Sequence, residues 1–336
     1  MTKQELREHL FNVYSANLAH CFQGVEDTFL CPFCLNTFGR EAIQGDSKEV
    51  ILAHCVQESL GGRLVTLACA GCDCPAGHEI DVHLVNRLQT TEFFNGTSPR
   101  SQRVWVNTVG QRVRADFSIR KGEKGRFETH IKIDGKNSPP GQWQEMKEAM
   151  VNGDALQHPL SMTQRGQMCF NMDVSRVALL RSAYLLMFQK FGYSYVLHDN
   201  LARLRQQFEK PNEAIVTGRP VVSLSPDSFP RSTVVVVTEP AGFNAFLPVL
   251  VFRTAGGSRW AFGVFMPGLD ADAGSIYERL AEHQNDNATV GLKFATWDDE
   301  GVALDKPEAV HLPYDVWAGL RGGLVDAPES ERAGPD

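Results

Sequence analysis

Four cysteines in two C-x-x-C pairs are the residues of this sequence whose types and spacing most directly suggest chemistry. The pairs are Cys31-Pro-Phe-Cys34 and Cys69-Ala-Gly-Cys72. Two intervening residues allow a tight turn to direct both sulfurs of a pair at one ion, and two such pairs complete the four-sulfur shell of a structural zinc site. The 34 residues between the pairs are enough to form a hairpin with chemistry of its own. We therefore expect these four cysteines to bind one Zn²⁺.

The distribution of the cysteines favours metal over disulfides. Seven of the eight cysteines lie between Cys21 and Cys74, and clustered cysteines in a cytosolic chain are typical of metal sites. We expect a cytoplasmic protein because the N-terminus is polar and mixed in charge, unlike a signal peptide, and because no apolar run is long enough to cross a membrane. Two alternatives stay open. The cysteines could be buried free thiols, and Cys74 or Cys55 could replace one of the four ligands.

Further motifs lie between and after the two pairs. They are His54, then Ser59-Leu-Gly-Gly62, and, after the second pair, Gly77-His-Glu-Ile-Asp81. With the two pairs, these motifs over about residues 28–90 resemble the HNH endonuclease family, in the subgroup whose fold is held by two C-x-x-C knuckles. The stretch 178–193 is similar, more loosely, to segments that follow this module in related proteins. The resemblance implies a zinc-stapled ββα-metal module, treble-clef-like, near the start of the chain.

The same resemblance implies a reaction. In the family, a neutral histidine acts as general base on a water molecule that attacks a backbone phosphate, and a divalent cation, usually Mg²⁺, stabilises the leaving oxygen. By position, His54 would be the base. Asp73 would stand where the family has an Asn that binds the catalytic Mg²⁺ or Mn²⁺. The sequence departs from the family at Ala53, which replaces an acidic metal ligand.

The sequence leaves the consequence of Ala53 open. Glu58, His78 or Asp81 could supply the missing ligand, and the protein would then hydrolyse phosphodiester bonds. Otherwise the chain keeps the fold and has lost the chemistry, and it acts as a zinc-stabilised nucleic-acid-binding or assembly module.

Charge is distributed unevenly along the chain. The net charge is -7, yet ten Lys and Arg stand against four Asp and Glu between Pro99 and Lys136, and fifteen acidic residues stand against five basic ones from Asp270 onward. The basic stretch predicts contacts with phosphates, unless it is only a solvated strand face. We assign nucleic-acid contacts to Arg63, Arg112 and Arg114. We interpret Trp105 as a core residue rather than a stacking platform.

Hydrophobic periodicity predicts the elements that must position these residues. An amphipathic helix is expected over residues 3–20, and short strands and loops over 27–90 end in a helix at 81–88. Residues 174–191 are apolar around nearly the whole helical circumference, which indicates a buried central helix. Strands are expected at 104–106, 127–133, 233–238, 247–252, 260–265 and 290–296, and further helices at 143–151, 200–208 and 274–283.

We therefore predict an α+β protein with three parts. Residues 1–92 hold the N-terminal helix and the zinc module, and residues 322–336 form a disordered tail. Residues 93–321 form a larger α+β region, with the buried helix and a mostly antiparallel sheet, that recognises substrate or a partner. The expected function is a metal-dependent endonuclease acting on DNA. Its partner is nucleic acid, a protein partner is a further option, and no membrane association is expected.

Overall fold

The computed structural model describes residues 1–44, 47–159, 161–163, 170–239, 243, 245–270, 275–284, 291–296 and 302–321. The chain divides into two compact units. Unit 1 contains Met1–Leu84, Asn171–Arg253 and the described residues from Arg259 onward, and unit 2 contains Val85–Phe170 and Thr254–Ser258. This division differs from the predicted one, because the region expected as one body over 93–321 contributes to both units. The tail predicted at 322–336 lies outside the described residues.

Helix α1 (Lys3–Cys21) opens unit 1 and confirms the helix predicted over residues 3–20. A capping box closes its first turn. The hydroxyl of Thr2 accepts a hydrogen bond from the backbone N–H of Glu5, and the Glu5 carboxylate accepts one from the backbone N–H of Thr2. Two N–H groups that would otherwise lack a helical partner are thereby satisfied, which fixes where the helix begins.

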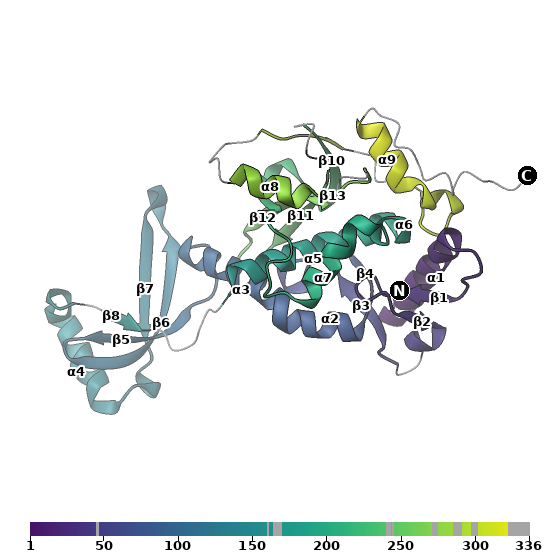
Figure 1. Cartoon of the computed structure of the whole chain (residues 1–336). Helices are drawn as coiled ribbons and strands as arrows, with labels where there is room; N and C mark the ends of the chain where they lie inside the picture. The colour runs from purple at the N-terminus through teal and green to yellow at the C-terminus, as the bar shows by residue number, and fades with distance from the viewer. Residues whose placement is uncertain are drawn as a thin grey trace, which may run out of the picture. The chain divides into compact units, whose positions relative to one another are not determined.

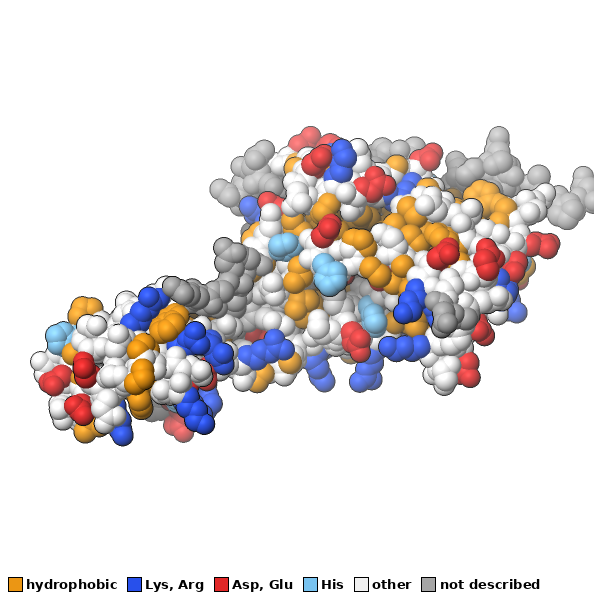
Figure 2. Space-filling view, turned by 90° about the horizontal axis from the view of Figure 1, so that it is seen from below, with side chains coloured by type: hydrophobic (Ala, Val, Ile, Leu, Met, Phe, Trp, Pro, Cys, Tyr) orange, Lys and Arg blue, Asp and Glu red, His pale blue; other side chains and the backbone are white. Residues whose placement is uncertain are grey.

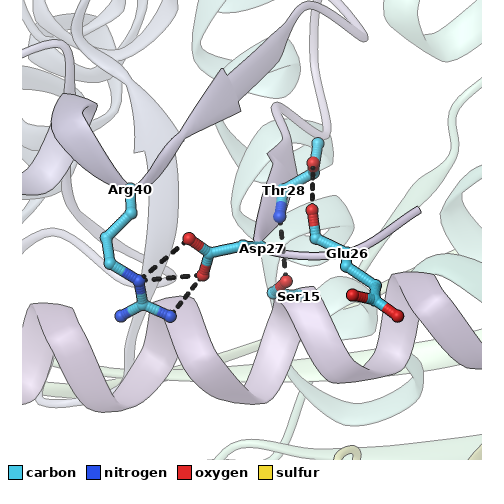
Figure 3. Close-up of polar contacts among 5 residues, drawn as sticks. All are labelled: Ser15, Glu26, Asp27, Thr28 and Arg40. Carbon is cyan, nitrogen blue, oxygen red and sulfur yellow. Dashed lines mark hydrogen bonds and ion pairs between the residues drawn. The ribbon is translucent and has the colours of Figure 1, made fainter.

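Strands β1 (Thr28–Leu30) and β2 (Thr37–Gly39) form a small antiparallel hairpin around the first C-x-x-C pair. Polar contacts fix the base of this hairpin, where β1 begins and β2 ends (Figure 3). The Nε atom of Arg40, directly after β2, lies 2.8 and 3.1 Å from the two carboxylate oxygens of Asp27, directly before β1. The N–H of Thr28 donates to the Ser15 hydroxyl of α1 at 2.9 Å. The hairpin is therefore closed at its base and attached to α1.

A second antiparallel hairpin, of β3 (Val50–His54) and β4 (Val65–Cys69), leads directly into a helical segment. The segment consists of α2 (Ala70–Ala76), a π-helical turn over residues 77–81 and α3 (Val82–Phe94). The helix predicted at 81–88 is confirmed, but helical structure begins earlier than expected. Pro75 lies within α2, near the start of the segment, and the wider π turn follows it directly.

Helix α5 (Met172–Phe191) runs through the interior of unit 1 and confirms the predicted buried helix. Aromatic rings from three helices meet near its C-terminal end. Tyr14 of α1 stacks on Phe188 with ring centroids 4.3 Å apart, and Tyr193 of α6 (Tyr193–Val196) contacts both rings edge-on. Helix α7 (Ala202–Glu209) follows and ends one residue beyond the helix predicted at 200–208. These contacts join α1 to the centre of unit 1.

The remaining part of unit 1 is an antiparallel sheet with the strand order β14-β10-β11-β12-β9, in which β13 also pairs with β11. Its strands are β9 (Val221–Leu224), β10 (Thr233–Glu239), β11 (Ala245–Arg253), β12 (Arg259–Val264), β13 (Met266–Pro267) and β14 (Lys293–Thr296). Helix α5 packs against β11 and β12, and α8 (Ile276–Gln284) and α9 (Leu312–Arg321) complete the unit (Figure 1). The prediction of a mostly antiparallel sheet beside a buried helix is confirmed.

Unit 2 is a four-stranded antiparallel sheet, in the order β7-β6-β5-β8, with one α-helix packed on it. Its elements are β5 (Gln102–Thr108), β6 (Gln111–Lys121), β7 (Phe127–Ile133), α4 (Pro140–Val151) and β8 (Ser161–Thr163). Its core consists of Val104, Val106, Val113, Ala115 and Met146. Because Met146 belongs to α4, the helix covers the face of the sheet from which these four strand residues project.

Trp105 lies outside this core, and the prediction of a core Trp105 is wrong. Its neighbours Val104 and Val106 fill the core, so Trp105 projects from the opposite face of the sheet, where it is half-buried. The register places Arg114 of β6 directly across from it. Among the described residues, no helix of either unit has the length and apolar character needed to cross a bilayer.

Candidate metal centre

The four cysteines of the two C-x-x-C pairs meet in space. The Sγ atoms of Cys31, Cys34, Cys69 and Cys72 all lie within 4.8 Å of one another, and those of Cys34 and Cys69 are 3.7 Å apart. A tetrahedral zinc ion with bonds of about 2.3 Å would separate its sulfurs by about 3.8 Å. The predicted ligands are therefore brought together at a spacing that could hold a metal such as zinc.

Local backbone geometry presents each pair. The N–H of Leu35 donates to the carbonyl of Cys31 at 2.9 Å, and the N–H of Cys31 donates to the carbonyl of Asn36 at 3.0 Å. Leu35 has a φ of +58°, so the chain reverses directly after the first pair. In the second pair, Cys69 ends β4 and Cys72 lies in the first turn of α2. A turn and a strand-to-helix junction thus hold the four sulfurs.

The electrostatics of the cluster favour a bound cation. Hydrogen bonds from the thiols of Cys69 and Cys72 stabilise a thiolate at Cys31 and lower the pKa of Cys31. Hydrogen bonding to that thiolate, together with its negative charge, raises the pKa values of Cys69 and Cys72. Four thiolates this close cannot coexist without a positive ion, whereas a divalent cation stabilises all of them. A bound Zn²⁺ would cross-link the first hairpin to the start of α2, and its closed shell would take no part in catalysis.

The two alternative ligands lie outside this group. Cys55 is buried, and burial raises the pKa of its thiol to about 12, which disfavours the thiolate that a metal requires. Cys74 is exposed. In the part of the chain that the structure describes, the sulfurs that meet are those of the two C-x-x-C pairs, without Cys55 or Cys74.

A buried arginine of α5 links both cysteine pairs to the rest of unit 1. Arg181 is 3% exposed. Its guanidinium binds Asp73, next to the second pair, and reaches Asp81 at 3.1 Å. Its central carbon lies 4.8 Å from the ring centroid of Phe33, inside the first pair. Burial raises the pKa of Asp81, and the nearby positive charge of Arg181 opposes this effect.

Two tyrosine hydroxyls form hydrogen bonds with the backbone at the first pair. Tyr184 of α5 donates to the carbonyl of Pro32 at 2.7 Å. The hydroxyl of Tyr193 donates to the carbonyl of Leu30 at 2.8 Å and accepts from its N–H at 2.9 Å. Both rings are fully buried. The backbone that carries Cys31 is therefore hydrogen-bonded on either side of that residue.

Sequence reasoning missed the roles of Arg181, Tyr184 and Tyr193. Arg181 did leave a signal, because a charged residue inside an otherwise apolar, buried helix needs partners of opposite charge. The tyrosines left none, because buried tyrosines are ordinary core residues and their hydrogen-bond partners are backbone carbonyls of any residue type.

The predicted catalytic residues, His54 and Asp73, do not form a cluster like that of the four cysteines. His54 ends β3 and is half-buried, and the side chain of Ala53 before it is fully buried. Both Asp73 and Asp81 bind Arg181. Within the described ranges, the four cysteines are the one group of three or more His, Cys, Asp or Glu side chains that is close enough to hold a metal. Asp73, the predicted cation ligand, is therefore engaged by Arg181.

The three arginines assigned to nucleic-acid contacts belong to different units. Arg63 is exposed, in the turn between β3 and β4 of unit 1. Arg112 and Arg114 lie on β6 of unit 2, and the central carbons of their guanidinium groups are 4.8 and 5.0 Å from the ring centroid of Trp105. Arg112 and Arg114 thus share one cluster with Trp105, a grouping that was not predicted from the sequence.

Comparison of the chain with protein-family models, with curated proteins and with solved structures finds no match. The function of the chain is therefore inferred from the geometry of the cysteine cluster and from the motifs that surround it.

Proposed function

We propose that about residues 28–90 form a zinc-stapled ββα-metal module of the HNH type, and that the protein uses it to bind nucleic acid. The arrangement of the four cysteines carries this proposal. The first pair lies in a knuckle, the hairpin β3–β4 follows, and the second pair lies where that hairpin leads into α2. One metal ion joining a knuckle to a helix start around a hairpin is the architecture that the motif resemblance implies. A reducing compartment, the cytoplasm, would keep these thiols available for zinc.

Binding without cleavage is the function that the surroundings of His54 favour. A divalent cation for phosphodiester hydrolysis needs hard oxygen ligands. Ala53 offers none, and the carboxylates of Asp73 and Asp81 are held by Arg181. Moving Asp73 onto a cation would deprive the buried Arg181 of a partner, and breaking a buried ion pair costs about 3–5 kcal/mol. We therefore place nucleic-acid binding before cleavage.

Endonuclease activity is the second candidate, and the position of His54 favours it. The imidazole ends β3, on the hairpin that the cysteines clamp, where the resemblance places a general base. Glu58 and His78 are exposed side chains of the same module that could bind Mg²⁺ or Mn²⁺. Neither is tied into the Arg181 network, so both are free of the competition that affects Asp73.

Two assays on the zinc-loaded protein separate the candidates. Fluorescence anisotropy with labelled single- and double-stranded oligonucleotides measures binding, and nicking of plasmid DNA in Mg²⁺ or Mn²⁺ measures cleavage. We expect the unaltered protein to bind an oligonucleotide and to leave the plasmid intact. Gain of nicking in Ala53→Asp would identify the missing carboxylate as the reason.

The control for His54 is His9→Ala, which removes an exposed imidazole from α1 of the same unit, outside the proposed catalytic site. Nicking by the unaltered protein that disappears in His54→Ala and persists in His9→Ala would establish the endonuclease instead. Failure to bind any oligonucleotide would contradict both candidates.

A further inference from the structure

A hollow on the surface of unit 2 has the side chains of a phosphate-binding site. Its lining includes three cations and three hydroxyls: Arg120, Lys121, Lys132, Ser98, Ser101 and Ser118. The carboxylate of Asp116 also lines it. Phosphate oxygens are bound in proteins by this combination of Lys or Arg with Ser hydroxyls. In one view of the surface, Lys and Arg side chains are numerous over the part of the chain that contains β5, β6 and β7 (Figure 2).

The cations of this hollow are available to a ligand. Within the described residues, the side chains of Arg120, Lys121 and Lys132 form no ion pair with a carboxylate. The carboxylate of Asp116 instead faces Arg103, whose Nε atom is 4.0 Å away. The hollow is therefore lined by three Lys or Arg side chains and one carboxylate, which leaves an excess of positive charge.

The sheet register places this hollow and the Trp105 cluster on one face. Along β6, Arg114, Asp116, Ser118 and Arg120 alternate with residues that face the core, so they project from the side opposite α4. Cross-strand pairing adds Trp105 beside Arg114, Lys132 beside Asp116 and His130 beside Ser118. Six residues of strand separate Arg114 from Arg120, which corresponds to about 20 Å. One continuous face thus carries an aromatic cluster at one end and the cationic hollow at the other.

We infer that this face binds a single strand of nucleic acid, with backbone phosphates in the hollow and a base stacked on the Trp105 cluster. The inference rests on the proposed function and names the surface that contacts the ligand. Unpaired cations complement the phosphate backbone. A half-exposed aromatic ring with two guanidinium groups beside it is the kind of platform on which unpaired bases stack. A single strand is favoured over a duplex because a duplex keeps its bases stacked inside.

The test uses the full-length, zinc-loaded protein and a fluorescein-labelled single-stranded DNA of 20 nucleotides, in anisotropy titrations at several salt concentrations. Arg120→Gln/Lys132→Gln removes two cations of the hollow. The matched control, Lys136→Gln/Lys147→Gln, removes two exposed cations of the same unit that do not line it. We expect the hollow variant to lower the slope of log affinity against log salt by about 1.4, since each phosphate contact contributes about 0.7 for single strands. The control should leave the slope unchanged.

A third variant tests the stacking platform. Trp105→Ala should weaken binding of the single strand about tenfold with an unchanged salt slope, because an aromatic ring contributes stacking and no charge. Circular dichroism melting of all three variants checks that unit 2 stays folded. The duplex of the same sequence should bind more weakly than the single strand.

Four results would overturn the inference. Equal slopes for the two double variants would remove the hollow from the binding surface. A duplex that binds as tightly as the single strand would exclude single-strand recognition, and unchanged binding by Trp105→Ala would exclude the stacking platform. Displacement of the oligonucleotide by millimolar inorganic phosphate at constant ionic strength would identify a small-anion site.

In each case the unaltered protein still binds nucleic acid, so the proposed function survives. If the unaltered protein binds no oligonucleotide, the proposed function and the inference fail together.

Discussion

In unit 1, Arg181 beside the cysteine pairs is buried and bound to two partly buried carboxylates, whereas in unit 2 the cations along β6 are exposed or half-buried and form no ion pair with an acid within the described residues. The sequence composition follows the same division. Residues 85–170 contain thirteen Lys and Arg and eight Asp and Glu, whereas the rest of the chain contains twenty and thirty-two. Residues 85–170, where nucleic acid is proposed to bind, therefore carry a net positive charge, although the net charge of the whole chain is -7.

The difference shows how burial decides what a charged residue does. A charge removed from water must be compensated by partners of opposite charge, so Arg181, Asp73 and Asp81 link α5 to the segment that begins with α2. A charge that remains in water can exchange its solvent and counterions for a ligand phosphate. Substitutions in the first group should thus alter stability, and substitutions in the second should alter binding.

The largest expected effect concerns the cysteines that form the metal centre. Cys69→Ser should lose the bound zinc and unfold the module, because structural zinc contributes about 10–16 kcal/mol to folding in small zinc domains. Cys74→Ser should keep the zinc and the fold, because the Cys74 thiol lies outside the cluster. Elemental analysis should find about one zinc per chain in the unaltered protein and in Cys74→Ser. A folded, zinc-free protein would contradict the metal centre, and zinc loss in Cys74→Ser would assign a ligand role to Cys74.

The next effect concerns the buried arginine. Arg181→Met should destabilise unit 1 by about 3–5 kcal/mol, because it leaves the carboxylates of Asp73 and Asp81 partly buried without their cation. The control is Arg176→Met in the same helix, which breaks an exposed pair with Asp173 and should cost about 0–1 kcal/mol. Urea unfolding of zinc-loaded protein measures both changes.

A triple variant sharpens this test. Arg181→Met combined with Asp73→Asn and Asp81→Asn removes all three charges and should recover much of the lost stability, since uncompensated charge causes the loss. Equal costs for Arg181→Met and Arg176→Met would show that the buried link contributes nothing to the fold.

The contrast between the units also explains what the sequence could predict. The cysteine ligands were predictable because each C-x-x-C pair is a local motif whose spacing determines its geometry. Helices α1 and α5 were also predictable, because their apolar residues recur at helical spacing over a long stretch. The roles of Asp73 and Asp81 were not predictable, because they depend on Arg181, which is 108 and 100 residues away along the chain. A motif match assigned Asp73 to a cation, but the contact that decides its role is made by another helix.

The smallest expected effect tests the face from which Trp105 projects. The sequence predicts a core position for Trp105, and truncating a core Trp costs about 3–5 kcal/mol. Trp105 instead projects from the face of the sheet opposite to that of Val104 and Val106. Trp105→Ala should therefore remove the contacts with Arg112 and Arg114 and lower the stability of unit 2 by about 1 kcal/mol. Met146→Ala, on the core face, should cost about 2–5 kcal/mol. Hydrogen exchange of peptides from β6 reports the stability of unit 2 itself. Faster exchange in Trp105→Ala than in Met146→Ala would reverse the assignment of the two faces, and the single-strand surface would lose its aromatic platform.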